Sequence, residues 1–250
     1  MREAVELQQR GSASPRVRRH LYATAARLAS SAMWAAVDGR HLDQAVTLSG
    51  LSGDAATNFW VWSQASSLYK HVGQHGDALA AAEASRATRV VRQDPFYASL
   101  AHARLAVRHA GTGELTAARR SLGRAQDALD RSDPTEPRPS WMGFWGQGDL
   151  HLHAVITCFD LGQWADAESH AHRALALLPR DTARDRALLH AYLALAQLHQ
   201  GELEPAVSTA LVVPTDIARR VGRLVDGFGD RLRALAPGSA QARAWTEYAR

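Results

Sequence analysis

Gly162-Gln-Trp-Ala-Asp-Ala167 separates two long runs rich in alanine and leucine, and its pattern recurs along the chain. In each copy a glycine is followed five residues later by an alanine, and the other copies are Gly73-Gln-His-Gly-Asp-Ala78, Gly113-Glu-Leu-Thr-Ala-Ala118 and Gly201-Glu-Leu-Glu-Pro-Ala206. A glycine accepts the left-handed backbone that ends a helix, and a small alanine lets the next helix pack closely. Alternating strand patterns do not occur, and the abundant alanine favours helix. Each copy therefore predicts the turn of a helical hairpin.

The spacing of these glycines predicts the type of repeat. A fainter copy, Gly39-Arg-His-Leu-Asp-Gln-Ala45, begins 34 residues before Gly73, and the later intervals are 40, 49 and 39 residues. A period of 34 residues with a glycine at the hairpin turn resembles the tetratricopeptide repeat. The longest interval contains residues 132–140, whose three prolines predict an inserted loop. The sequence thus predicts an all-α fold: a right-handed superhelical solenoid of about five tetratricopeptide-like hairpins with C-terminal capping helices.

Helical periodicity and turn signals also predict where the elements and domains lie. Helices are expected at 17–37, 42–51, 55–72, 75–91, 95–110, 115–131, 147–161, 164–178, 182–200, 203–211, 218–236 and 239–249. Pro237-Gly238-Ser239 ends one of these helices and caps the next. We expect a basic, flexible N-terminal arm over residues 1–19, the repeat array over 20–214 and the capping helices over 215–250.

The composition argues against a membrane-spanning or secreted protein. The chain is 46% hydrophobic and 22% charged, and it has no apolar run long enough to cross a membrane and no signal-peptide pattern at its start. Cys158 is the only cysteine, so we expect a buried thiol, no internal disulfide and a cytoplasmic location. The net charge is +4, but arginines and acidic residues alternate along most predicted helices. This pattern is typical of solvated, salt-bridged helix faces.

One basic cluster differs from these mixed faces, namely Arg10, Arg16, Arg18 and Arg19. A flexible arm of this kind could bind phosphates of a nucleic acid without reading their sequence.

The segments between the turns resemble a known family. They are Leu51-Ser-Gly-Asp-Ala-Ala-Thr-Asn-Phe-Trp-Val-Trp62, Arg92-Gln-Asp-Pro-Phe-Tyr-Ala-Ser-Leu-Ala-His-Ala-Arg104, Ala125-Gln-Asp-Ala-Leu-Asp-Arg131, Arg184-Asp-Arg-Ala-Leu188 and Leu235-Ala-Pro-Gly-Ser239. They are similar to the tetratricopeptide-repeat sensory region of actinobacterial XRE-type helix-turn-helix transcriptional regulators. The resemblance implies a regulatory module that binds a ligand or a peptide.

One part of that family's pattern is missing. Its members begin with a helix-turn-helix domain, whereas residues 1–20 cannot hold two DNA-reading helices. Direct, sequence-specific DNA binding is therefore not expected. The chain is expected to be a stand-alone module, a shortened member or a piece of a longer protein.

A search for catalytic motifs finds no phosphate-cradling loop, no dinucleotide fingerprint, no zinc-protease helix and no nucleophile elbow. The histidine pairs His151-Leu-His153 and His170-Ala-His172 have a spacing of two, so the two side chains of each pair point to different sides of a helix. We expect no metal site, no cofactor and no enzymatic activity.

Aromatic residues lie at or just before the first helix of several hairpins. In tetratricopeptide arrays the first helices line a concave groove, and counting back from each turn glycine selects the residues on that side. The predicted groove residues are Trp60, Ser63, Ser67, Phe96, Leu100, Arg104, Trp145, Asp149, Leu152 and His153. They predict a site for a small molecule or a peptide. The alternative is that Trp141 and Trp145 seal the proline-rich insertion against the repeats.

Three functions remain open at this stage. The first is the regulatory ligand- or peptide-binding module. The second is a protein–protein interaction scaffold, with a homodimer formed through the apolar stripe of Leu224, Phe228, Leu232 and Leu235. That stripe could equally pack on the preceding hairpin. The third is an enzyme that uses His153 and Asp149, although no acid–base or nucleophile set is readable.

Overall fold

The computed structural model describes residues 13–36, 39–214 and 219–248, which form helices joined by turns and loops. These residues contain no strand, and the all-α class is confirmed. Their contacts divide the chain into two compact units, residues 1–135 and 136–250. The division falls inside the proline-rich insertion, while the domain limits expected from the sequence stay a prediction.

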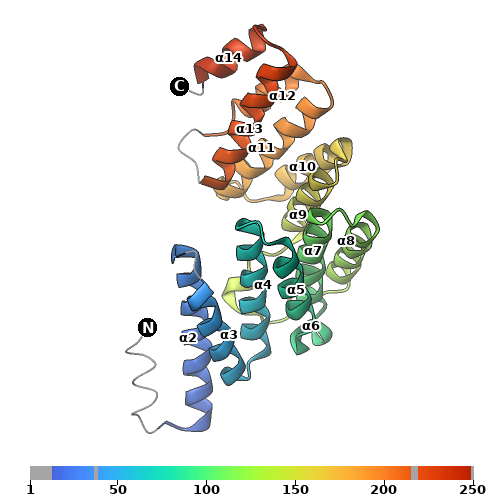
Figure 1. Cartoon of the computed structure of the whole chain (residues 1–250). Helices are drawn as coiled ribbons and strands as arrows, with labels where there is room; N and C mark the ends of the chain where they lie inside the picture. Colours follow the sequence, from blue (N-terminus) through green and yellow to red (C-terminus); the bar gives the residue numbers. More distant parts are fainter. Residues whose placement is uncertain (1–12, 37–38, 215–218, 249–250) are drawn as a thin grey trace. The chain divides into compact units, whose positions relative to one another are not determined.

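The first unit is built from three helical hairpins and one short helix. Helix α2 pairs with α3, α4 with α5 and α7 with α8, and the short α6 packs between α4 and α7 (Figure 1). The helices are α2 (Pro15–Ala36), α3 (Gly39–Ser52), α4 (Ala55–His71), α5 (His75–Arg86), α6 (Arg89–Gln93), α7 (Pro95–Gly111) and α8 (Leu115–Asp130).

The second unit contains two hairpins followed by a pair of C-terminal helices. Helix α9 pairs with α10 and α11 with α12, while α13 packs on α11 and α14 packs on α12 and α13. Its elements are the 3-10 turn η1 (Ser140–Met142), α9 (Gln147–Asp160), α10 (Trp164–Leu177), α11 (Ala183–His199), α12 (Leu203–Ala210), α13 (Arg219–Leu235) and α14 (Ala240–Tyr248). The two units together give the five hairpins that the sequence predicts.

The four predicted turn glycines all adopt the same left-handed conformation. Their φ angles are 82° at Gly73, 79° at Gly113, 72° at Gly162 and 83° at Gly201. In every case the residue after the glycine donates its amide to the carbonyl five residues earlier, as Glu114 does to His109 at 2.8 Å. This bond belongs to the Schellman ending of a helix, which satisfies a carbonyl that would otherwise be unpaired.

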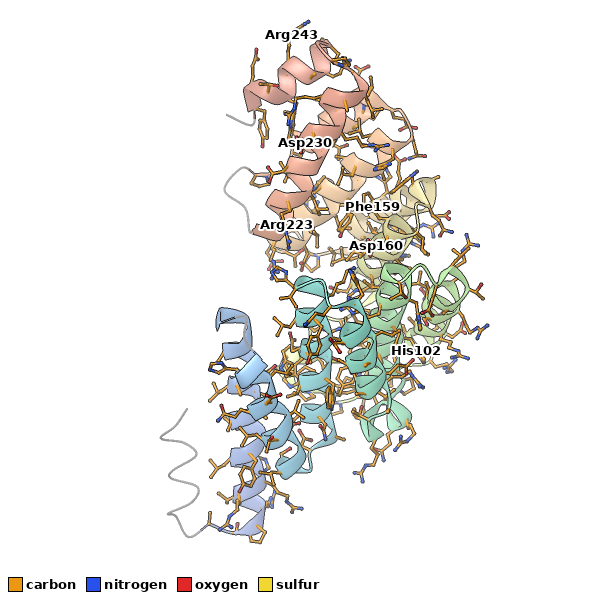
Figure 2. All side chains as sticks on the ribbon, viewed as in Figure 1. His102, Phe159, Asp160, Arg223, Asp230 and Arg243 are labelled. Atoms are coloured by element: carbon orange, nitrogen blue, oxygen red, sulfur yellow. The ribbon has the colours of Figure 1, made fainter. Side chains whose placement is uncertain are left out.

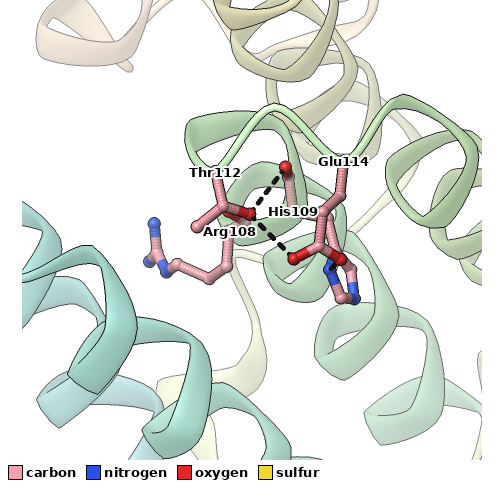
Figure 3. Close-up of polar contacts among 4 residues, drawn as sticks. All are labelled: Arg108, His109, Thr112 and Glu114. Carbon is pink, nitrogen blue, oxygen red and sulfur yellow. Dashed lines mark hydrogen bonds and ion pairs between the residues drawn. The ribbon is translucent and has the colours of Figure 1, made fainter.

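Side chains reinforce one of these turns. The Glu114 carboxylate accepts hydrogen bonds from the hydroxyl of Thr112 at 3.2 Å and pairs with His109 Nδ1 at 2.9 Å (Figure 3). The turn between α7 and α8 is therefore held by both backbone and side-chain bonds.

The alanine of each repeated pattern has the packing role that its size predicts. Ala78, Ala118, Ala167 and Ala206 are fully buried, as is Ala45 in the fainter copy. A larger side chain at these positions would push the two helices of the hairpin apart.

All twelve expected helices occur, and two differences have local causes. The expected helix at 75–91 is split, because Thr88 takes an extended conformation and its hydroxyl donates to the Ser85 carbonyl at 2.7 Å. The expected flexible arm is helical from Pro15 onward, so Arg16, Arg18 and Arg19 lie on α2. Arg10 lies outside the described residues.

The C-terminal apolar stripe serves the core of the second unit. Phe228 and Leu232 are buried with Trp245 in one cluster, and Leu224 packs against it, whereas Leu235 alone is exposed. These contacts agree with the alternative in which the stripe packs on the preceding helices, and a homodimer formed through the C-terminal helices stays a prediction. The polar side of α13 carries the exposed Arg223 and Asp230 (Figure 2).

Within the described ranges, no helix combines the length and the apolar character that a membrane span requires.

Candidate interaction site

A buried arginine joins the first helices of two consecutive hairpins in the first unit. Arg108 of α7 is 7% exposed, and its Nε donates to the Ser66 hydroxyl of α4 at 2.7 Å. The Ser66 hydroxyl in turn donates to the Ala78 carbonyl of α5 at 2.7 Å. This chain of bonds links α4, α5 and α7, and it fixes the face that α7 turns toward α4.

Arg104 lies one helical turn before Arg108 on the same side of α7, because residues four apart share a helix face. Its Nη1 is buried and has no hydrogen-bond partner among the described residues. Burial lowers the pKa of the Arg104 guanidinium to about 10, so the group is still charged at neutral pH. A buried charge without a partner is strongly unfavourable and therefore uncommon. Arg104 is the described side chain best suited to receive an anionic group from outside the chain.

The remaining predicted residues of the first unit fall into two groups. Trp60, Phe96 and Ser67 are half-buried, and the Ser67 hydroxyl donates to the Ser63 carbonyl at 3.1 Å. Ser63 and Leu100 are buried, and the Ser63 hydroxyl is hydrogen-bonded to Ser85 at 2.8 Å. Ser63 and Leu100 therefore pack inside the first unit, and their part in a ligand site stays a prediction.

The predicted residues of the second unit are mostly enclosed. Trp145 is 4% exposed and Leu152 is 7% exposed. The indole of Trp145 meets the His153 ring edge to face, with 5.2 Å between the ring centres. Burial of Trp145 agrees with the alternative in which it helps to seal the insertion, and a part of Trp145 and Leu152 in a ligand site stays a prediction.

Asp149 is a buried carboxyl on α9, with 9% of its surface exposed. Burial, and then the nearby negative charge of Asp185, raise the pKa of Asp149 to about 7. His153 Nδ1 donates to the Asp149 backbone carbonyl at 2.9 Å, which ties the ring to the backbone of the same helix. Asp149 can thus gain or lose a proton near neutral pH.

The ten predicted site residues are divided between the units, six in the first and four in the second. Their membership of one ligand site stays a prediction. The sequence reasoning missed Arg108 and Asp185. Arg108 could have been found from its spacing of four after Arg104, whereas the approach of Asp185 to Asp149 has no sequence signal.

The histidine pairs do not assemble a three-ligand metal site within the part of the chain that the structure describes. One histidine of the first pair contacts one of the second across the α9–α10 hairpin, where His151 Nδ1 and His170 Nδ1 are 3.0 Å apart. Burial lowers the pKa of both rings, so they pack as neutral partners. Cys158 is buried beside Ala167 and Ala196, as expected of a packing thiol.

A shallow recess of about 270 Å³ lies between α7 and α8. It is lined by His102 (Figure 2), Arg124, Asp127 and Arg131, which mix both signs of charge. Burial and the nearby Arg124 lower the pKa of His102.

Comparison with known proteins supports the fold. No protein-family model matches the chain, and no curated protein matches it. Among solved structures, the chain is similar to a chain in the crystal structure of the APC/C hetero-tetramer Cut9-Hcn1, with a TM-score of 0.54 and 15% identity. The match covers 98% of this chain and 44% of that chain, so this chain spans less than half of the other's length. At this identity the likeness shows the fold alone, and it agrees with the hairpins described above: the chain folds as tetratricopeptide-like helical repeats.

Proposed function

We propose that this chain is a protein-interaction scaffold whose first unit binds an acidic segment of a partner protein. The observation that carries the proposal is the buried guanidinium of Arg104, which has an unsatisfied Nη1. A carboxylate from a partner would supply the missing acceptor and neutralise the buried charge at the same time. A guanidinium is suited to this task because its planar donors match the two oxygens of a carboxylate.

The surroundings of Arg104 support a peptide as the source of that carboxylate. Phe96 precedes Arg104 on the same side of α7, and Trp60 lies on α4, and both rings are half-buried. Two half-buried aromatic residues and a cation in the same unit suit a segment that combines an apolar anchor with an acidic residue. Arrays of helical hairpins present extended surfaces of this kind.

The test is a selection of random displayed peptides on the immobilised full chain, followed by affinity measurement on the chain and its variants. We expect the selected peptides to share an aspartate or glutamate next to an aromatic or aliphatic residue. Arg104→Met should weaken their binding by about tenfold or more, which corresponds to at least about 1.4 kcal/mol. Arg120→Met is the matched control, since it removes an exposed arginine of α8.

Stability separates a binding role of Arg104 from a structural one. Methionine keeps most of the side-chain volume and removes the unpaired charge, so the unfolding free energy of Arg104→Met should be equal to or above that of the wild type. Selected peptides without acidic residues, or equal losses of affinity for the Arg104 and Arg120 variants, would contradict the proposal. A small molecule retained in native mass spectrometry would favour the sensing module instead.

We also propose a regulatory context for this scaffold. The support is the resemblance of the quoted segments to the sensory region of XRE-type regulators, together with a single, buried cysteine that suits a reducing cytoplasm. If the proposal holds, the chain should co-purify with a helix-turn-helix protein encoded beside it, and absence of any such complex would count against it.

The proposed role is binding and not catalysis. The support is that in the second unit His153 donates to the Asp149 backbone carbonyl and meets the Trp145 ring edge to face, so Nδ1 and one edge of the ring are engaged within the fold. Turnover of a co-purified small molecule by the intact chain would overturn this part of the proposal.

A further inference from the structure

A basic recess lies in the first unit, between the beginning of α2 and the connection from α3 to α4. Figure 1 shows these two segments at the same end of the unit. The recess has a volume of about 450 Å³, and its wall on α2 carries Arg16, Arg19, His20 and Arg27. We propose that this recess binds a phosphate-bearing small ligand, a function independent of the peptide site at Arg104.

The spacing of the α2 residues explains why their charges converge. Arg16, Arg19, Ala23 and Arg27 are separated by three, four and four residues, so they form one stripe along the helix. Ala23 also lines the recess, and its single methyl group occupies less space than the arginines before and after it in the stripe. The recess is therefore open to solvent, with Arg16, Arg19 and His20 exposed along one side.

The opposite wall is the turn of Ser52, Gly53 and Asp54. The Ser52 hydroxyl is already used, because it donates to the Ser49 carbonyl at 2.7 Å and accepts from the Asp54 amide at 3.1 Å. The Asp54 carboxylate caps α4 by accepting from the Thr57 amide at 3.0 Å. Asp54 is thus held at the end of α4 by its own bonds.

The balance of charge in the recess favours an anion. The three arginine side chains make no hydrogen bond or ion pair with any residue in the described ranges, and the only carboxylate in the lining is Asp54. The recess also lies against the N-terminal end of α4, where the helix dipole is positive. Arginine donors pair with carboxylate and phosphate oxygens alike, but a phosphate presents more oxygens and more negative charge, so it can engage more than one of the three arginines at once.

The size and shape of the recess favour a small ligand over a nucleic acid. A volume of about 450 Å³ lies within the range of small-molecule pockets. A duplex would instead be bound by cations spread along an exposed face, each on a separate phosphate. Arg18 provides the comparison, because it is exposed on α2 as Arg16 and Arg19 are, but it does not line the recess.

The test is isothermal titration calorimetry of the full chain with pyrophosphate, with a nucleoside diphosphate and with sodium chloride at matched ionic strength. We expect saturable binding of both phosphate probes and none of chloride. Arg19→Ala and Arg27→Ala should each weaken binding by about tenfold, whereas Arg18→Ala should change it by less than about twofold. Circular dichroism would establish that every variant keeps the helical content of the wild type.

A variant that is expected to strengthen phosphate binding provides a second test. Asp54→Asn removes the negative charge and keeps a residue that caps helices well, so it should tighten pyrophosphate binding by about threefold or more. Weaker binding by Asp54→Asn, no saturable binding by any phosphate probe, or equal losses for Arg18 and Arg19 variants would overturn the proposal. Tighter binding of duplex DNA than of pyrophosphate, with Arg18 and Arg19 equally needed, would show a diffuse nucleic-acid surface instead.

Discussion

At the scale of single residues, burial shifts the pKa of two ionisable groups, but only one of them can become neutral near pH 7. The pKa of Arg104 is lowered only to about 10, so Arg104 stays charged. The pKa of Asp149 is raised to about 7, so Asp149 is partly protonated near pH 7. Arg104 therefore stays positively charged near neutral pH, and an anion bound to it would stabilise that charge. The aspartate can relieve its own burial by taking up a proton, so its effect on the protein depends on pH.

The pH dependence of stability is the first prediction. The pKa of Asp149 is about 7 in the folded chain and 3.8 without burial, so the folded state holds the proton more tightly. The unfolding free energy is therefore highest at low pH as far as Asp149 is concerned. It falls by up to about 4 kcal/mol as the pH rises from about 4 to about 7. We expect Asp149→Asn to be more stable than the wild type at about pH 8 in urea unfolding, with a smaller difference at about pH 5.

The comparison with Asp149→Asn is needed because histidines act with the opposite sign. Burial lowers the pKa of His102, His151 and His170, so their contribution is lost as the pH falls below the usual histidine value. These histidines are the same in both proteins and cancel in the difference. Equal pH profiles for the wild type and Asp149→Asn would contradict the assigned shift.

The bonds around Arg108 give the second prediction. Ser66→Ala removes the acceptor of the Arg108 Nε and the donor to the Ala78 carbonyl, so it should lower the unfolding free energy by about 1–3 kcal/mol. Ser67→Ala is the matched control, because its contact with Arg108 Nη2 is 3.5 Å long and the effect should stay below about 1 kcal/mol. Urea unfolding of both variants measures the difference. A larger loss for Ser67→Ala would show that Ser66 does not hold the three helices together.

At the scale of elements, the hairpin turns depend on one backbone conformation. Gly113 has a φ of 79° and is exposed, so any change in stability at this position comes from the backbone and not from lost packing. Gly123 offers a contrast inside α8, where it is exposed in ordinary helix and a Cβ atom would meet nothing within 4 Å.

The third prediction is that alanine has opposite effects at these two glycines. Gly113→Ala should destabilise the chain by about 1–2 kcal/mol, because its Cβ disfavours the left-handed backbone. Gly123→Ala should stabilise the chain by about 0.5–1 kcal/mol, because alanine loses less backbone entropy in a helix. Thermal unfolding of the two variants tests both signs, and a neutral Gly113→Ala would mean that the turn can relax to another conformation.

The elements were the most predictable part of this chain. Local sequence signals mark the helix ends and the hairpin turns. Examples are the turn glycine Gly162, the buried alanine Ala167 and the capping residue Asp94, whose side chain accepts a hydrogen bond from the Phe96 amide. The break at Thr88 was missed because an alanine-rich run predicts continuous helix, and the hydroxyl bond that ends it depends on local geometry.

The candidate sites were less predictable, because they depend on distances between helices. Helical spacing correctly placed Arg104 and Phe96 on one side of α7, but it could not show that Leu100 between them is fully buried. Arg108 and Ser66 are 42 residues apart in the chain, and nothing in either segment indicates the bond between them. The recess on α2 arises in the same way, from a helix and a turn that meet only in the folded unit.

At the scale of the whole molecule, each compact unit has a hydrophobic core of its own. In the first unit one cluster joins Ala26, Leu48 and Val61, and in the second Leu198, Phe228 and Trp245 form another. In helical-repeat proteins stability is approximately the sum of repeats and their neighbour contacts, so we expect a change inside one unit to act most strongly on that unit.

The last prediction is that the two units can be destabilised one at a time. Gly113→Ala should raise hydrogen exchange at low urea in peptides from residues 1–135, and Asp149→Asn at about pH 8 should lower it in peptides from 136–250, because each change alters the stability of the unit that contains it. Mass spectrometry of the exchanged peptides follows both units in one sample. If either variant shifted the protection of all peptides together, the chain would unfold as a single cooperative body. A ligand in the α2 recess gives an independent check, since pyrophosphate should then protect the first unit by an amount that follows its own affinity.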